Sequence, residues 1–160
     1  MSDTVLSFLL GVIQGLTEFL PISSSAHLLL PSLLFGFNDL GLSFDIAVHA
    51  GTLIAVIYYF RKEIALMFKS FFLSDENLLP HRNLAISLIV ATIPIILAGL
   101  FVKDFIEQRV FNIEHIAIAN IIFAGILLFA YLKRKDIKNL YSVTLYSALF
   151  VGVFQSLALF

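Results

Sequence analysis

The sequence predicts an all-α integral membrane protein, and three observations support this fold class. Hydrophobic residues make up 60% of the 160 residues and charged residues only 13%, whereas a soluble domain is roughly half apolar and about a quarter charged. The mean hydropathy is +1.00. Several apolar runs reach the roughly 17–20 residues that a helix needs to cross a bilayer. We therefore treat 1–160 as a single membrane domain.

The first element is predicted to be a re-entrant helical hairpin over about 4–37. Its first half, 4–19, is marginal as a membrane span, and Pro21 and three serines interrupt it; its second half, 28–37, is far too short to cross. Irregular backbone at membrane depth is tolerated only where protein shields it or where it lines a water-filled cavity. The turn of this hairpin is therefore expected to line a cavity.

Three full spans are predicted to follow, at about 44–60, 84–102 and 116–132, with a kink at Pro94. A polar loop with an amphipathic part occupies 61–82, and charged turns are expected at 103–112 and 133–139. A last apolar run fills 140–160.

This last run contains an internal echo of the first hairpin. Gly11-Val-Ile-Gln-Gly-Leu16 recurs as Gly152-Val-Phe-Gln-Ser-Leu157. Since the two copies are predicted to enter the membrane from opposite sides, they indicate an inverted-topology repeat, whose sites form where discontinuous helices meet near the midplane. The chain would then hold the first part of the repeat and a truncated start of the second at 140–160.

Orientation is predicted from the lysines and arginines of the short loops. Four lie in 61–82 and four in 133–139, against two in 103–112 and none in 38–43. Basic loops stay in the cytoplasm, so the first hairpin is expected to enter from the outside.

Glu18 and Gln14 are the first candidate site residues. A carboxylate at membrane depth costs roughly 3 kcal/mol or more, so Glu18 must be near water, bound to a cation or protonated. A protonated, purely structural Glu18 is the alternative. Gln14 lies one helical turn earlier on the same face, so both side chains can point at one ligand.

The hydroxyls of Ser23, Ser24 and Ser25 form the second group of candidates. One serine is needed as the N-cap of the returning helix, and the start of that helix is an anion site suited to phosphate. Ser24 and His27 are three residues apart, and a hydroxyl beside a possible base is a nucleophile arrangement. His49, in the first full span, is a candidate to face the same cavity, with helix packing as the alternative.

The rest of the composition excludes several classes of function. The formal net charge of −1 gives no sign of nucleic-acid binding, and the absence of cysteine excludes disulfides and thiolate chemistry. The N-terminus lacks a basic region followed by a cleavage site, so no signal peptide is expected.

These residues carry a family resemblance that covers the chain in order. Gln14-Gly-Leu-Thr-Glu-Phe-Leu-Pro-Ile-Ser-Ser-Ser-Ala-His27 closely resembles the first signature of the undecaprenyl-diphosphate phosphatases, the bacterial bacitracin-resistance proteins. Phe44-Asp-Ile-Ala-Val-His-Ala-Gly-Thr-Leu-Ile-Ala-Val56 is similar to the next block of that family. Gly152-Val-Phe-Gln-Ser-Leu-Ala-Leu-Phe160 resembles the approach to its second signature.

The resemblance implies a multi-pass hydrolase of the bacterial inner membrane with a site open to the periplasm. It would convert undecaprenyl diphosphate to undecaprenyl phosphate and inorganic phosphate, recycling the lipid carrier of peptidoglycan synthesis and conferring bacitracin resistance. Its implied partners are a prenyl diphosphate lipid, the bilayer and a divalent cation (Mg²⁺ or Ca²⁺). Pairing of two copies in a homodimer is a separate expectation.

Residue roles follow from the matched positions. Glu18 would bind the metal or transfer a proton, Ser24 would be the nucleophile or a phosphate ligand, and His27 would be a base or a rival nucleophile. The residues that would contact the substrate around them are Gln14, Ser23, Ser25 and His49.

The sequence departs from the family pattern in two ways. Gln14 stands where many members have a glutamate, so a second carboxylate ligand is missing. The second signature, proline-glycine followed by Ser-Arg-Ser-Gly, is expected beyond Phe160, and its arginine would clamp the diphosphate. The 160 residues by themselves are therefore expected to be an incomplete and inactive part of the enzyme.

Two other classes of function remain open from the sequence. Inverted repeats with broken helices are a theme of transporters, so a lipid-carrier flippase is the main alternative. A packing subunit without chemistry is the third. A clustered nucleophile, base and acid favour the enzyme, because a flippase needs no Ser–His pair.

The predicted orientation can be tested by cysteine labelling in intact cells. A cysteine at Asn38 should react with an impermeant maleimide, whereas a cysteine at Lys135 should react only after the membrane is permeabilised. The reverse pattern would invert the predicted topology.

Overall fold

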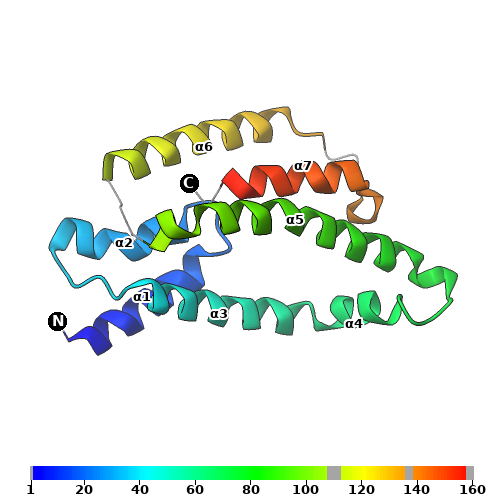
Figure 1. Cartoon of the computed structure of the whole chain (residues 1–160), viewed down its shortest axis with the longest axis horizontal. Coiled ribbons are helices and arrows are strands. Elements are labelled where there is room, and N and C mark those ends of the chain that lie inside the picture. Colours follow the sequence, from blue (N-terminus) through cyan, green and yellow to red (C-terminus); the bar gives the residue numbers. More distant parts are fainter. Residues whose placement is uncertain (1, 108–112, 136–138, 158–160) are drawn as a thin grey trace. The chain divides into compact units, whose positions relative to one another are not determined.

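The computed structural model describes residues 2–107, 113–135 and 139–157. In these ranges the chain is helical with connecting turns and no strand (Figure 1), which confirms the predicted all-α class. Three helices are long and apolar enough to cross a membrane: Leu42–Tyr59, Glu76–Lys103 and Ile116–Lys133. The chain divides into two compact units, Met1–Tyr59 with Phe111–Lys133, and Phe60–Val110 with Arg134–Phe160.

The first unit begins with two short helices, α1 (Asp3–Thr17) and α2 (Ser24–Phe35). At about 1.5 Å per residue they are roughly 22 and 18 Å long, and both fall short of a hydrocarbon core about 30 Å thick. Their lengths suit the predicted hairpin. α2 ends at Gly36, whose φ of 67° is the left-handed conformation that glycine adopts without strain.

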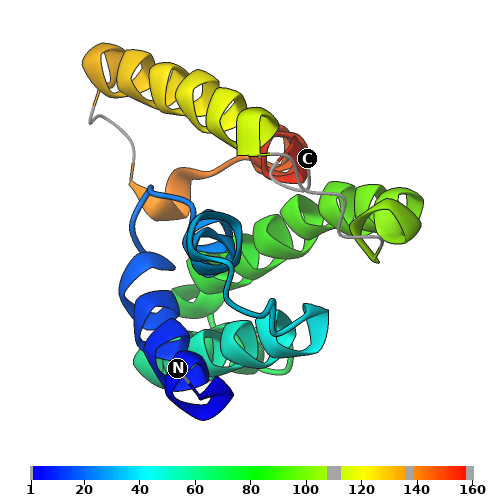
Figure 2. The ribbon, with the colours of Figure 1, turned by 90° about the vertical axis from the view of Figure 1, so that its left-hand side faces the viewer.

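α3 (Leu42–Tyr59) and α6 (Ile113–Lys133) complete the first unit. They lie where the spans 44–60 and 116–132 are predicted. α1 contacts both α2 and α3, as Figure 2 shows. The buried side chains at this junction are those of Leu6, Leu10 and Leu28, with Ile13, Leu40, Phe44 and Val48 packed against them. In a bilayer, close packing of this kind holds helices together, and here it fixes α3 beside the turn of the hairpin.

The second unit is built around α5 (Leu79–Glu107), preceded by α4 (Arg61–Lys69) and the short helix η1 (Glu76–Leu78). α5 begins before the predicted span 84–102 and continues through Pro94. The turn predicted at 103–112 is wrong for Lys103–Glu107, which are helical; the remaining residues of that turn, 108–112, lie outside the described ranges. Charged residues in a long membrane helix can extend beyond the hydrocarbon core, so hydropathy alone misplaces the helix end.

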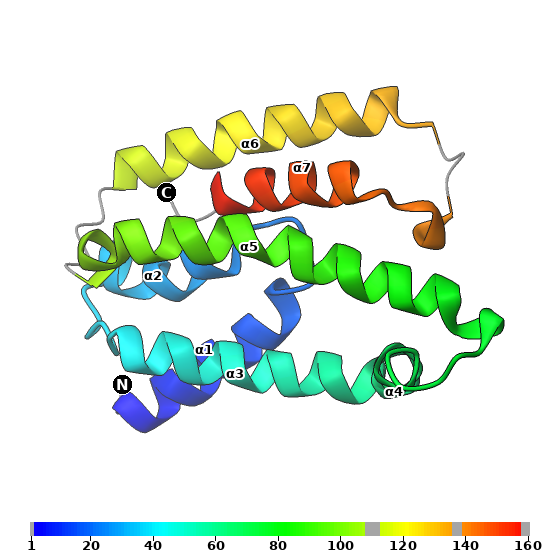
Figure 3. The ribbon, with the colours of Figure 1, turned by 45° about the vertical axis from the view of Figure 1, so that its right-hand side comes forward.

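η2 (Leu140–Ser142) and α7 (Leu145–Ser156) return along α5 (Figure 3). The ring of Tyr141 stacks on that of His81 at the start of α5, with centroids 5.2 Å apart. Further along, Gly152 lies against Ala91. α5 and α7 therefore run in parallel, and the segments that lead into them lie at the same end of this unit.

The two copies of the internal echo differ in their surroundings. Gly152 is buried against α5 and Gln155 is exposed, whereas Gly11 has open space around its Cα and Gln14 is fully buried. The inverted repeat stays a prediction from the sequence.

The contact between α5 and α7 depends on the missing side chain of Gly152. A Cβ there would overlap the carbonyl oxygen of Ala91, and such overpacking typically costs about 1–3 kcal/mol. Gly152→Ala should therefore lower the thermal stability of the protein in detergent. Gly11→Ala is the matched control, because its Cβ would meet open space, and it should leave stability unchanged or raise it. Equal stability of both variants would contradict the close crossing of α5 and α7.

Candidate functional site

The candidate site forms where the first hairpin turns. α1 ends at Thr17, and Glu18 is its C-cap, with its N–H donating to the Gln14 carbonyl at 2.9 Å. The chain reverses over 18–23 and reaches Ser23, whose φ of 56° is left-handed and uncommon for a residue with a side chain. α2 begins directly afterwards at Ser24. This reversal brings the first residue of α2 back to the last turn of α1.

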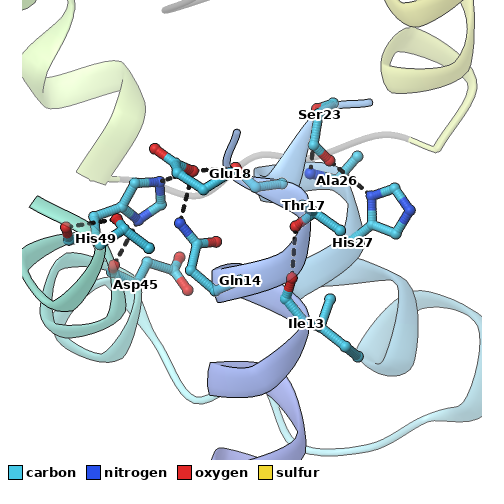
Figure 4. Close-up of polar contacts among 11 residues, drawn as sticks. Ile13, Gln14, Thr17, Glu18, Ser23, Ala26, His27, Asp45 and His49 are labelled. Carbon is cyan, nitrogen blue, oxygen red and sulfur yellow. Dashed lines mark hydrogen bonds and ion pairs between the residues drawn. The ribbon is translucent and has the colours of Figure 1, made fainter. Parts of the chain in front are cut away.

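Three side chains converge on one carboxylate oxygen, Oε2 of Glu18. Figure 4 shows Gln14 and His49 pointing toward it. The Ser24 hydroxyl donates to it at 2.6 Å, and the Gln14 amide donates through Nε2 at 2.7 Å. Nε2 of His49, on α3, lies 3.7 Å away. We call these four residues the Glu18 cluster. It joins a carboxylate, a hydroxyl, an amide and an imidazole from three helices.

Gln14 is the most buried member of the cluster, with no exposed surface. Its Nε2 is paired with Glu18, but its Oε1 is buried without a hydrogen-bond partner. An unpaired buried acceptor costs about 1–3 kcal/mol. The hydroxyl of nearby Thr17 does not supply the missing hydrogen bond, because it donates to the Ile13 carbonyl at 2.8 Å.

His49 is held in place by its own helix. Its Nδ1 lies 2.7 Å from the carbonyl oxygen of Asp45, one turn earlier. This contact turns Nε2 toward Glu18. The His49 side chain is 39% exposed and that of Glu18 28%, so both groups are partly open to their surroundings.

Ser23, Ser25 and His27 lie apart from the cluster. Ser23 is the N-cap of α2, and its hydroxyl accepts from the Ala26 N–H at 3.4 Å. Nδ1 of His27 lies 2.8 Å from the Ser23 carbonyl, and its ring points away from Glu18 in Figure 4. Ser25 is exposed.

The expected Ser24–His27 pair is therefore not formed. Each residue has a different partner: Ser24 bonds to Glu18, whereas His27 bonds back to its own helix turn. A spacing of three residues predicts a shared helix face, but it does not predict which rotamer each side chain adopts.

The cluster can be compared with what a divalent cation needs. The described residues contain no group of three or more His, Cys, Asp and Glu side chains placed to hold a metal. Glu18 supplies one carboxylate, and Gln14, whose Nε2 faces that carboxylate, carries an unpaired Oε1 as a further oxygen donor. Mg²⁺ is commonly held by one or two carboxylates together with waters and substrate phosphates. The donor set fits an open site of that kind.

A separate cavity of about 290 Å³ belongs to the second unit, where Phe71, Asp75 and Arg82 help to line it. It contains none of the predicted site residues.

The Ser24–Glu18 hydrogen bond was not predicted from the sequence. It spans six residues across an irregular turn, and no regular periodicity indicates it. His49 was predicted as a candidate to face the same cavity, but its contact with Oε2 of Glu18 depends on how α3 packs against α1, which the sequence spacing does not indicate.

Known proteins similar to this chain agree on one family. Residues 7–160 match the family described as Bacitracin resistance protein BacA. The chain is 46% identical over 158 residues to an undecaprenyl-diphosphatase of Saccharophagus degradans, covering 98% of the chain and 60% of the relative. It is 45% identical over 152 residues to undecaprenyl-diphosphatase 1 of Pseudoalteromonas translucida, covering 94% and 57%.

A third relative, an undecaprenyl-diphosphatase of Aliivibrio salmonicida, is 43% identical over 157 residues, covering 96% of the chain and 58% of the relative. The chain thus spans less than two thirds of the length of these relatives. No solved structure matches it. The match over nearly the whole chain shows that it belongs to the bacitracin resistance protein BacA family.

Proposed function

We propose that the complete protein carrying this sequence hydrolyses undecaprenyl diphosphate to undecaprenyl phosphate and inorganic phosphate. The relatives named undecaprenyl-diphosphatase support the reaction. The observation that carries the proposal is the 2.6 Å hydrogen bond from the Ser24 hydroxyl to the Glu18 carboxylate. A hydroxyl paired with a carboxylate has the means to lose its proton as it attacks phosphorus.

In the proposed first step, Oγ of Ser24 attacks the terminal phosphorus of the diphosphate. The new Ser24 O–P bond forms as the bond between the terminal phosphorus and the bridging oxygen breaks, and Glu18 takes the hydroxyl proton. Undecaprenyl phosphate leaves with the bridging oxygen.

In the second step, water attacks the phosphoserine and the Ser24 O–P bond breaks. Glu18 returns its proton to Oγ, and the water protons leave with inorganic phosphate. One water is consumed for each diphosphate, and Ser24 and Glu18 end as they began.

Phosphoryl transfer depends on positioning and on stabilising charge on the phosphate oxygens, and the first hairpin offers both. Gln14 holds Oε2 of Glu18 from the buried side. Among the first N–H groups of α2, those of Ala26 and His27 bond to Ser23. The N–H groups of Ser24 and Ser25 lie at the positive end of the helix dipole, where a phosphate is favoured. Glu18 and Gln14 would hold a divalent cation, Mg²⁺ or Ca²⁺, which would neutralise charge on the phosphates.

The proposed setting is the bacterial inner membrane, with the site open to the periplasm. The three apolar helices support a membrane protein, and the basic loops support the orientation. A site at this depth meets a lipid-anchored diphosphate without extracting it from the bilayer. Its product is the carrier lipid that peptidoglycan synthesis reuses, and bacitracin resistance would follow from faster removal of the diphosphate.

The proposal predicts that Glu18→Gln in the complete protein removes most phosphate release. Glutamine preserves the size of the side chain but cannot take the Ser24 proton, and a positioned acid–base group typically contributes about 10²–10⁴-fold. The assay is release of inorganic phosphate from farnesyl or undecaprenyl diphosphate with Mg²⁺ or Ca²⁺ present.

Glu63→Gln provides the matched control, since Glu63 is an exposed carboxylate on α4, and it should keep full activity. If Glu18→Gln releases phosphate at a rate close to that of the unmodified protein, Glu18 has a structural role and the proposed mechanism is wrong.

A further inference from the structure

His49 faces the Glu18 carboxylate across a gap that a direct hydrogen bond does not bridge. The two atoms, Nε2 of His49 and Oε2 of Glu18, are 3.7 Å apart, whereas charge-assisted N–H···O bonds are about 2.7–2.9 Å long. His49 comes from α3, and Glu18 from the end of α1. The packing of α3 on α1 therefore places the imidazole beside the carboxylate.

The other ring nitrogen of His49 indicates which atom carries the proton. Nδ1 lies 2.7 Å from the carbonyl oxygen of Asp45. A carbonyl oxygen only accepts, so Nδ1 must be the donor and hold a hydrogen. In the neutral ring Nε2 then presents its lone pair, and this lone pair faces Glu18.

Two electron-rich atoms that face each other over such a gap suit a cation between them. Histidines that bind metals nearly always donate their second ring N–H to a backbone carbonyl, a carboxylate or water, which fixes the tautomer and the orientation of the ring. The Nδ1 contact of His49 with Asp45 has this form.

Gln14, which bonds to the same oxygen of Glu18, gives an independent observation. Its Oε1 is fully buried and has no partner, although its Nε2 is bonded to Glu18. Turning the amide over would place Oε1 at the 2.7 Å position beside Oε2 of Glu18. Two oxygens at that separation repel each other unless a cation lies with them. In either orientation, one atom of the buried Gln14 amide therefore lacks a favourable partner unless a further group is bound.

From these contacts we infer that His49 is a nitrogen ligand of the divalent cation, which it binds together with Glu18 and Oε1 of Gln14. This inference rests on the proposed function only for the cation and adds a ligand to it. His49 then adds a third donor to a site in which Gln14 stands in place of a second carboxylate. An imidazole nitrogen suits Zn²⁺, Fe²⁺ and Ni²⁺ better than an all-oxygen donor set does, whereas Mn²⁺ accepts oxygen donors as Mg²⁺ does and serves as its paramagnetic probe.

His27 provides a comparison within the same unit. Its Nδ1 has the same type of contact, 2.8 Å from the carbonyl oxygen four residues earlier. Its ring, however, points away from Glu18 (Figure 4). Both histidines therefore contact a carbonyl oxygen of their own helix turn. Only His49 also lies near the Glu18 carboxylate.

The test is electron spin-echo modulation of Mn²⁺ bound to the complete protein in detergent, without substrate. We expect the modulation of a directly coordinated ¹⁴N nucleus in the unmodified protein and in His27→Gln. His49→Gln should lose this ¹⁴N modulation. It should also bind Mn²⁺ at least about tenfold more weakly, because even the loss of a group that only supports a ligand typically weakens metal affinity by about 10–100-fold. Glu18→Gln should also weaken Mn²⁺ binding by at least about tenfold.

Three results would overturn the inference: no coordinated ¹⁴N in the unmodified protein, unchanged modulation in His49→Gln, or unchanged binding in Glu18→Gln. The first needs no variant to fold. The outcome is separable from the proposed hydrolysis, because Mn²⁺ binding is measured without turnover. Loss of phosphate release in Glu18→Gln with no ¹⁴N signal would keep the hydrolase and remove His49 as a ligand.

Discussion

One electrostatic requirement organises the first unit: the partly exposed carboxylate of Glu18, at the end of an apolar helix, must be neutralised. An unpaired carboxylate at membrane depth costs roughly 3 kcal/mol or more. Hydrogen bonds from Ser24 and Gln14 meet part of this cost, and His49 faces the same oxygen without closing on it. The Glu18 carboxylate is therefore hydrogen-bonded on two sides, while His49 stays 3.7 Å away. This arrangement leaves the carboxylate able to bind a charged ligand and to exchange a proton with it.

The backbone around the turn provides these partners. α1 and α2 are each too short to cross the bilayer, and the turn between them brings the end of α1 to the start of α2. The left-handed Ser23 reverses the chain within a few residues and places Ser24 at the start of α2. The leucine packing between α1, α2 and α3 then brings His49 to the same point. The conformation of Ser23 and the apolar packing of α1, α2 and α3 thus position the chemistry.

The sequence was sufficient for the all-helical membrane class, because long apolar runs with few charges have no other stable form in a bilayer. It also paired Gln14 with Glu18, since residues four apart share a helix face. It predicted a Ser24–His27 pair that the structure does not form, because side-chain rotamers near an irregular turn are set by tertiary partners. It was also wrong about Lys103–Glu107, where helical backbone continues past the apolar run. The approach of His49 depends on packing between helices, which no spacing along the chain encodes.

The central claim is that Glu18 takes the proton of the Ser24 hydroxyl, so that the two residues act in one step. The most direct measurement is a double-mutant cycle of phosphate release by the complete protein, comparing kcat/KM for the unmodified enzyme, Glu18→Gln, Ser24→Ala and the double variant. If the two residues act as one unit, the double variant should be no slower than the slower single variant, because residues that act together are strongly non-additive. Losses that multiply in the double variant would show that the two residues act independently and would contradict this account.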